Sequence, residues 1–118
     1  MALRIATLFC IILLAALSLM PEDDMVRTGL PGRLEHFIAY MGAAATTMGG
    51  YRDRYGTVGV ISFYWVYAGI LEYLQQFSAG RHPSVWDFAA SALGALCGAL
   101  AIALFVRMTR ASPILSKR

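Results

Sequence analysis

The chain has 118 residues, of which 58% are hydrophobic and only 14% are charged, and its mean hydropathy is +0.60. Soluble domains have about a quarter charged residues and under half apolar ones, so this composition excludes a soluble globular domain and a disordered chain. The length allows one domain, which excludes an enzyme with a separate cofactor domain. The net charge of +3 comes without a dense Lys/Arg cluster, which removes the electrostatic case for nucleic-acid binding.

Four apolar stretches are candidate transmembrane helices. They run over about Leu3–Met20, Leu34–Tyr51, Thr57–Gln76 and Val85–Val106. Crossing the hydrocarbon takes roughly 20 helical residues, and continuous rather than alternating apolar runs argue against strands. The sequence therefore predicts an all-α integral membrane bundle of four transmembrane helices, formed by a single domain over residues 1–118.

The basic residues predict the orientation of this bundle. If the N-terminus is inside, seven of the ten basic side chains face the cytoplasm: Arg4, Arg52, Arg54, Arg107, Arg110, Lys117 and Arg118. The other three then face outward. This asymmetry follows the positive-inside rule and predicts that both termini are cytoplasmic.

The first apolar stretch leaves an alternative open. A charged start followed by an apolar run resembles a signal peptide, and Ala16-Leu17-Ser18 could be its cleavage site. The apolar run of about 16 residues is long for a signal peptide. We therefore expect the first helix to be retained.

Polar and ionisable side chains gather at the predicted outward ends of three helices. They are Arg33, His36, Tyr40, Glu72, Gln75, Arg81 and Asp87. Ionisable residues within or beside membrane spans are costly, which makes each one a functional candidate. Helical spacing places His36 and Tyr40 on one helix face, and Asp87 and Ser91 on another. If these faces meet, a polar pocket opens outward at the membrane surface.

The predicted contact faces also carry small residues, as expected for helix–helix contact in lipid. On the third stretch the face holds Ser62, Trp65, Gly69, Glu72 and Gln76. On the fourth stretch, Gly94 and Gly98 let another helix approach closely. A homo-oligomer through these two glycines is one expected use of that face.

Each polar residue also has a purely structural interpretation. Asp87 can cap its own helix, and Arg81 can lie near the negative end of the preceding helix. Glu72 can be a buried acid satisfied by Gln75 or Arg81, and His36 can be an interfacial residue. Six or more polar groups at one depth nevertheless favour a shared site.

Two motifs lie in this polar region. In the first, Glu72 is followed by Gln75 three residues later, by Arg81 six after that, by Asp87 after a further six, and then by spaced glycines. The second is Arg33-Leu34-Glu35-His36-Phe37-Ile38-Ala39-Tyr40, a basic residue followed by His-Phe and Tyr. Together these motifs resemble those of the VanZ-like family, over about residues 30–107.

This resemblance implies a multi-pass protein of the bacterial cytoplasmic (inner) membrane in a cell-envelope setting. The namesake of the family is associated with teicoplanin resistance. The resemblance implies no particular reaction and no cofactor.

The first expected function is non-enzymatic binding of an anionic lipid or a lipid-linked envelope precursor. Arg81 and Arg33 would hold phosphate, since guanidinium matches phosphate oxygens in bidentate fashion. Glu72 and Asp87 would orient these arginines. The groups expected to hydrogen-bond the headgroup are Tyr40, Gln75, Gln76 and Ser91, and His36 belongs to the same expected ligand-binding set.

Two alternatives belong to other classes. One is a small membrane enzyme acting on a lipid headgroup, with His36 as general base. A zinc variant would use His36, His82, Glu72 and Asp87, but these lack tight ligand spacing, so no metal is expected. The other alternative is a structural or partner-binding helix bundle, in which the polar groups only lock the helices together.

Overall fold

The computed structural model describes residues 1–111, and all of its regular secondary structure over that range is helical, which confirms the all-α part of the predicted fold. Its main helices are α1 (Ala2–Leu19), α2 (Gly32–Leu74) and α3 (Val85–Ala111). Two short 3-10 helices, η1 (Glu22–Asp24) and η2 (Gln75–Phe77), lie in the connections. Lys117 and Arg118, which contributed to the predicted orientation, lie outside the described residues.

All three main helices are long and apolar enough to cross a membrane. Large apolar side chains also cover their outer surfaces. On α1, Ile5, Phe9 and Ile12 are 64%, 64% and 61% exposed. Because such a surface is costly in water and favourable in lipid, the bundle has the exterior of a membrane protein.

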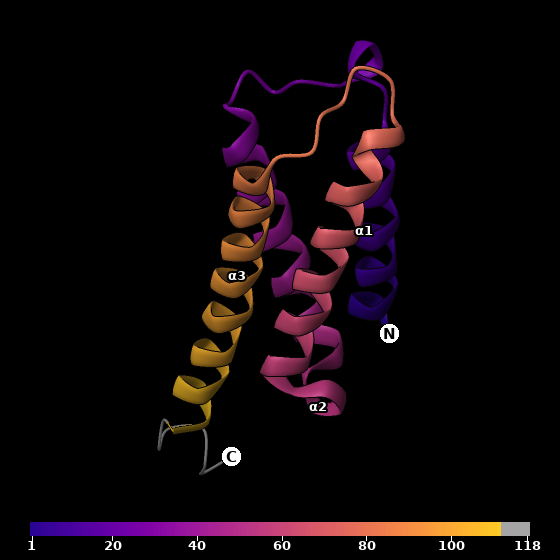
Figure 1. Cartoon of the computed structure of the whole chain (residues 1–118). Helices are drawn as coiled ribbons and strands as arrows, with labels where there is room; N and C mark the ends of the chain where they lie inside the picture. The colour runs from indigo at the N-terminus through magenta and orange to yellow at the C-terminus, as the bar shows by residue number, and fades with distance from the viewer. Residues whose placement is uncertain (112–118) are drawn as a thin grey trace.

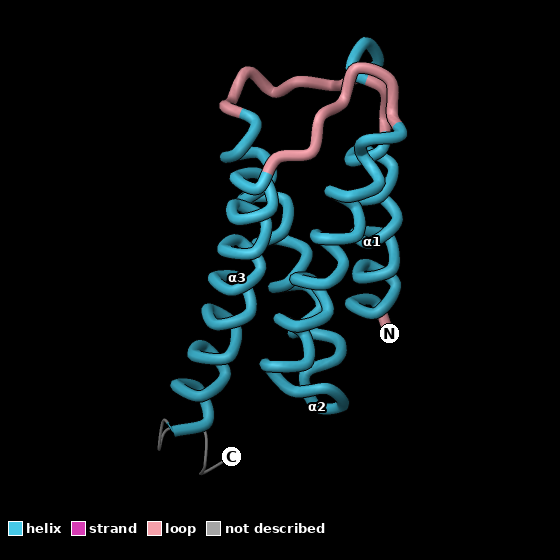
Figure 2. The backbone as a smooth tube through the Cα atoms, in the orientation of Figure 1, coloured by secondary structure: helices cyan, strands magenta, loops and turns pink. Residues whose placement is uncertain are grey.

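Helix α2 reverses direction at Gly56, whose φ of 69° and ψ of 173° are non-helical. A positive φ is available to glycine at little cost. The Tyr64 hydroxyl donates to the carbonyl oxygen of Ala43 at 3.3 Å. A straight α-helix would hold these two residues roughly 30 Å apart. The first limb (32–55) and the second limb (57–74) therefore run antiparallel, side by side (Figures 1 and 2).

Small residues bring α3 against the first limb of α2. A Cβ atom added to Gly94 would lie 2.9 Å from the carbonyl carbon of Phe37, and one added to Gly98 would lie 2.9 Å from that of Met41. Glycines at contacts between membrane helices commonly allow the two backbones to come this close. The face expected to carry a homo-oligomer is thus covered by α2 of the same chain, and an oligomer would use another surface.

The buried face of the second limb agrees only in part with the predicted one. Ser62, Trp65 and Gln76 are exposed, whereas Tyr64 is fully buried, together with Val60, Ala68, Leu71 and Glu72. The Tyr64 hydroxyl lies 2.7 Å from the Thr47 hydroxyl, so it is satisfied inside the bundle. Part of the predicted face does contact α3, since Trp65 Nε1 donates to Ala92 O at 3.0 Å and Glu72 Oε1 accepts from Ser84 N. Tyr64 was not among the predicted contact residues, because small and polar residues were given more weight than a tyrosine with internal partners.

Helix α1 is attached to the rest of the bundle by side chains that bond to its backbone carbonyls. The Tyr67 hydroxyl donates to Ile11 O at 2.5 Å, and the Ser78 hydroxyl donates to Leu19 O at 2.8 Å. At the other end of the helix, Arg4 Nε donates to Gly50 O at 3.1 Å. These bonds join α1 to both limbs of α2 and to the connection that follows them.

Candidate functional site

The two connections between the main helices close the same end of the bundle (Figures 1 and 2). We call it the loop end; it comprises residues 20–31 and 75–84 and the adjoining helix ends. The opposite end, where α1 begins, α2 reverses and α3 ends, is the turn end. At the loop end, Glu22 N donates to Ala79 O at 3.0 Å, so the two connections are joined to each other.

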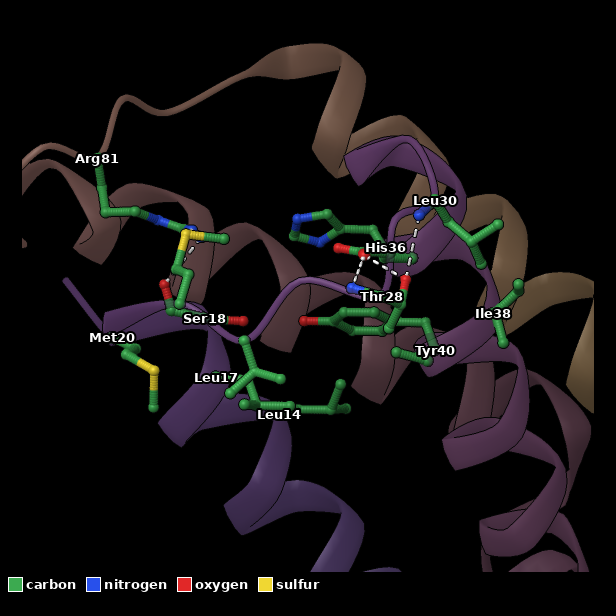
Figure 3. Close-up of a pocket in the computed structure, with 14 residues that line it drawn as sticks. Leu14, Leu17, Ser18, Met20, Thr28, Leu30, His36, Ile38, Tyr40 and Arg81 are labelled. Carbon is green, nitrogen blue, oxygen red and sulfur yellow. Dashed lines mark hydrogen bonds between the residues drawn. The ribbon is translucent and has the colours of Figure 1, made fainter. Parts of the chain in front are cut away.

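A cavity of about 280 Å³ lies at the loop end between α1, the first limb of α2 and the segment after α1 (Figure 3). Its polar lining includes Ser18, His36, Tyr40 and Arg81, and its apolar lining includes Leu14, Leu17, Met25 and Ile38. The cavity is therefore amphiphilic, with cationic and hydrogen-bonding groups beside an aliphatic wall.

Arg81 supplies the cation of this cavity. Its guanidinium donates to Ser18 O at 3.2 Å and to the sulfur of Met25. No carboxylate among residues 1–111 lies within 4.0 Å of the guanidinium. The carbonyls at the C-terminal end of α1 carry only a partial negative charge, so they do not neutralise Arg81. The Glu72 carboxylate acts on Arg81 from beyond 4.0 Å, without forming an ion pair.

His36 lines the cavity, and its ring also makes a hydrogen bond to α3. Its Nδ1 lies 3.3 Å from the hydroxyl oxygen of Ser91, which is only 2% exposed. If Ser91 donates, Nε2 carries the ring proton and the imidazole is a hydrogen-bond donor. If Nδ1 donates, Nε2 is a free base.

Tyr40 is the deepest polar side chain of the cavity lining, being 2% exposed. Its ring packs edge-to-face on Tyr64 with centroids 6.1 Å apart. Figure 3 shows the phenol lying between the α1 side chains and His36, with its oxygen directed toward the Ser18 side. Packing of this kind fixes the position of a hydroxyl that can hydrogen-bond a ligand.

The other sequence-predicted residues lie outside the cavity lining, at the start of α3. Glu72 Oε1 accepts a hydrogen bond of 2.7 Å from Ser84 N, just before that helix. Asp87 Oδ1 lies 3.8 Å from Arg33 Nε. The Arg33 guanidinium also lies 5.7 Å from the centre of the Trp86 ring. These contacts tie α3 to both limbs of α2.

Glu72 connects this network to the cavity. The carboxylate is near enough to interact electrostatically with Asp87, His36 and Arg81, and Tyr40 is in turn within range of Glu72. Gln75, one turn later, is 2% exposed, and its Nε2 has no hydrogen-bond partner among the described residues. The predicted residues therefore fall into two adjoining groups. His36, Tyr40 and Arg81 line the cavity, and the others form a polar network between α3 and the two limbs of α2.

The cavity also contains residues that sequence reasoning missed as ligand contacts. Glu35 lines it and accepts hydrogen bonds from Thr28 N at 3.1 Å and Thr28 Oγ1 at 2.5 Å, which fastens the segment after α1 to the start of α2. An acid in the first turn of a helix was the available signal. Ser18 and Met25 precede the region that carries the family resemblance, so their role had no sequence signal.

The residues considered for zinc do not gather. His82 is exposed in the second connection. Within residues 1–111, no three His, Cys, Asp or Glu side chains form a group that could hold a metal ion.

Comparison with known proteins gave no match to this chain among protein-family models, curated proteins or solved structures.

Proposed function

We propose that this chain is a multi-pass protein of the bacterial inner membrane, of the VanZ-like kind. It crosses the bilayer four times, with the two limbs of α2 counted as separate spans and both termini cytoplasmic. The antiparallel limbs support this topology. The turn end holds five arginines of the described chain, Arg4, Arg52, Arg54, Arg107 and Arg110, which supports a cytoplasmic turn end by the positive-inside rule.

In this orientation the loop-end cavity binds a phosphate-bearing lipid headgroup, from an anionic lipid or a lipid-linked envelope precursor. The observation that carries the proposal is the Arg81 guanidinium, which lines a cavity and has no carboxylate partner in the described chain. A guanidinium offers phosphate two parallel N–H donors. Tyr40 and His36 supply further polar groups on the same lining.

The apolar wall of the cavity favours a lipid over a free anion. Leu17 and Ile38 line the cavity and are also 42% and 44% exposed, so they belong both to the cavity and to the outer surface of the bundle. An acyl or prenyl chain from the bilayer can lie along that wall while its phosphate reaches Arg81. A precursor held in this way would give the protein a means of altering how a glycopeptide such as teicoplanin meets its target.

The test is native mass spectrometry of the chain extracted gently from bacterial membranes. We expect wild-type protein to retain an anionic or lipid-linked species, Arg81→Ala to lose at least about 90% of it, and Arg81→Lys to lose most of it because bidentate contact is gone. Arg27→Ala is the matched control, since Arg27 lies at the same end, is 64% exposed and is absent from the cavity lining. Folded yield is matched by circular dichroism.

Equal lipid loading in Arg81→Ala and Arg27→Ala would overturn the proposal. Failure of Arg81→Ala to fold, with Arg81→Lys folded and fully loaded, would favour the structural bundle, in which Arg81 serves only to hold α1.

The contact between His36 and Ser91 supports a second candidate, an enzyme that uses His36 as general base on a lipid headgroup. Base catalysis requires an unprotonated Nε2, whereas binding alone is served by an Nε2–H donor. Nitrogen-15 NMR of histidine-labelled protein distinguishes these two tautomers. We expect the Nε2–H form, and an Nδ1–H form would move the assignment toward the enzyme.

A further inference from the structure

A second hollow lies at the turn end, about the length of the bundle away from the first. It has a volume of about 410 Å³ and lies between the reversal of α2 and the last turns of α3. Arg52, Arg107 and Arg110 line it together with four small or apolar residues, Thr57, Ala103, Val106 and Ala111. Three arginines from two helices thus line one space.

The positive charge of this hollow is only weakly compensated. Asp53 is the sole carboxylate in the described residues of the turn end, and its Oδ1 lies 3.1 Å from Arg52 NH2. The Asp53 side chain is 88% exposed, so water screens its charge. No described carboxylate lies within 4.0 Å of Arg107 or Arg110. The hollow therefore keeps an excess of two guanidinium charges.

The hollow lies where the apolar surface of α3 ends. Leu104 and Phe105 are 57% and 64% exposed and belong to the lipid-facing side, and Arg107 follows within one turn. Lipid phosphates lie at this transition from apolar to charged surface. Ala103 and Val106 line the same hollow and add aliphatic surface, which suits the first carbons below a headgroup.

We propose that the hollow formed by Arg52, Arg107 and Arg110 binds a group with two phosphates, carried by a lipid of the leaflet at the turn end. Two phosphates match the excess of two guanidinium charges, and the fork geometry of arginine matches phosphate oxygens. Basic pockets between membrane helices at the cytoplasmic side are a general form of such sites. The proposal does not depend on the loop-end cavity, since no residue lines both.

The test uses the full-length chain in phosphatidylcholine nanodiscs, with cardiolipin as the probe that carries two phosphates on one lipid. Native mass spectrometry measures the occupancy of bound cardiolipin. We expect Arg107→Gln to weaken binding about fivefold, and the double variant Arg107→Gln with Arg110→Gln to weaken it more than about tenfold. Both side chains are exposed, so these variants should fold with wild-type thermal stability.

Arg54→Gln is the matched control. Arg54 is an exposed arginine at the same end, stacked 5.5 Å from the centre of the Tyr55 ring and absent from the hollow. We expect its binding to change less than about twofold. Equal losses in Arg54→Gln and Arg107→Gln would overturn the proposal, because they would indicate a diffuse basic surface. Absence of cardiolipin binding to wild type, together with the result below, would also overturn it.

Inorganic pyrophosphate identifies the source of the two phosphates. If pyrophosphate displaces cardiolipin and binds wild type but not the double variant, the hollow takes the diphosphate group itself and a soluble ligand is assigned. If cardiolipin binds and pyrophosphate does not compete, the lipid source is supported. If neither probe binds, the hollow is not a phosphate site.

Discussion

The loop end and the turn end of this bundle are both supplied with arginine, but they differ in what surrounds the guanidinium groups. At the loop end Arg33 lies 3.8 Å from Asp87, Arg27 lies 3.6 Å from Glu22, and Arg81 bonds to a helix carbonyl. At the turn end Arg107 and Arg110 border an open hollow without a described carboxylate beside them. The three loop-end arginines therefore all contact other segments of the chain, two of them through carboxylates, whereas Arg107 and Arg110 have no described carboxylate within 4.0 Å.

This difference follows from where the acids lie in the chain. Six of the seven Asp and Glu residues belong to the loop end, and only Asp53 belongs to the turn end. Because acids outnumber arginines at the loop end, a ligand there has to fit a defined geometry around Arg81. At the turn end, an excess positive field attracts anions before any contact is made. The two ends should therefore respond differently to the same perturbations.

The most damaging single change should be Gly94→Leu, which breaks the scaffold that both ends share. A Cβ atom at this position would lie 2.9 Å from the carbonyl carbon of Phe37, against backbone that cannot move aside. Overpacking of this kind costs about 1–3 kcal/mol and occasionally more. We expect a large loss of folded protein, measured by yield in detergent and by thermal unfolding. Gly42→Ala is the control, because its added Cβ has no neighbour within 4 Å, and an equal loss there would contradict the packing argument.

Glu72→Ala should loosen the loop end alone. It removes the acceptor for Ser84 N, and an unsatisfied buried donor costs about 1–3 kcal/mol. Glu72→Gln keeps a carbonyl oxygen and should recover most of that stability. Hydrogen exchange of the Ser84 amide checks the contact directly, while cardiolipin binding at the turn end should stay at the wild-type level. Equal exchange protection in both variants would mean that the carboxylate does not hold the start of α3.

Ionic strength should separate the two proposed sites. Exposed charges are screened within a Debye length that shrinks from about 30 Å at 0.01 M salt to about 8 Å at 0.15 M. Over that range we expect anion affinity at the turn end to fall about tenfold, and at the loop end less than about threefold, because Arg81 is half-buried. Titration in nanodiscs at the two salt concentrations measures both. If affinity at the two ends fell equally with salt concentration, the two sites would not differ in how strongly they depend on long-range electrostatic attraction.

Arg27→Ala should have the smallest effect. The Arg27 and Glu22 side chains are 64% and 53% exposed, and surface ion pairs contribute about 0–1 kcal/mol. We expect the free energy of unfolding to fall by less than about 0.5 kcal/mol. A larger loss, measured by chemical unfolding, would show that the segment around η1 supports the loop end more strongly than its exposure indicates.

Much of the helical layout could be predicted from the sequence. The start of α3 at Val85 and the reversal at Gly56 agree with the predicted stretches that begin at Val85 and Thr57. Glycine and a polar connection leave strong local signals of this kind. The sequence also predicted a close helix approach at Gly94. It did not predict that the approaching helix is α2 of the same chain.

The buried face of the second limb could not be predicted in the same way. In lipid the outer face of a helix is as apolar as the inner one, so hydrophobic periodicity carries little contrast. The local sequence therefore does not distinguish Tyr64 from Trp65 as the buried residue. Which of them is buried depends on partners far away in the sequence. Tyr64 bonds to Thr47 inside the bundle, while Trp65 Nε1 donates to Ala92 O at 3.0 Å from an exposed position.

The contribution of α1 to the cavity was also beyond sequence reasoning. Ser18 receives Arg81 through its backbone carbonyl, and a carbonyl is present at every residue. No side-chain motif can signal such a contact. The polar residues were predicted to share one depth, but the side of the bundle on which the cavity opens depends on where α1 packs.

The bonds that hold α1 also set an order of events during synthesis. Arg81 follows its acceptor Ser18 by 63 residues, and Tyr67 follows Ile11 by 56. At about 5–20 residues per second, α1 waits roughly 3–12 seconds in the bilayer before these donors emerge from the ribosome. Once Arg81 has bonded to Ser18, both residues line the cavity. The cavity is therefore completed late in synthesis, because its cation comes from a segment made after α1 and both limbs of α2.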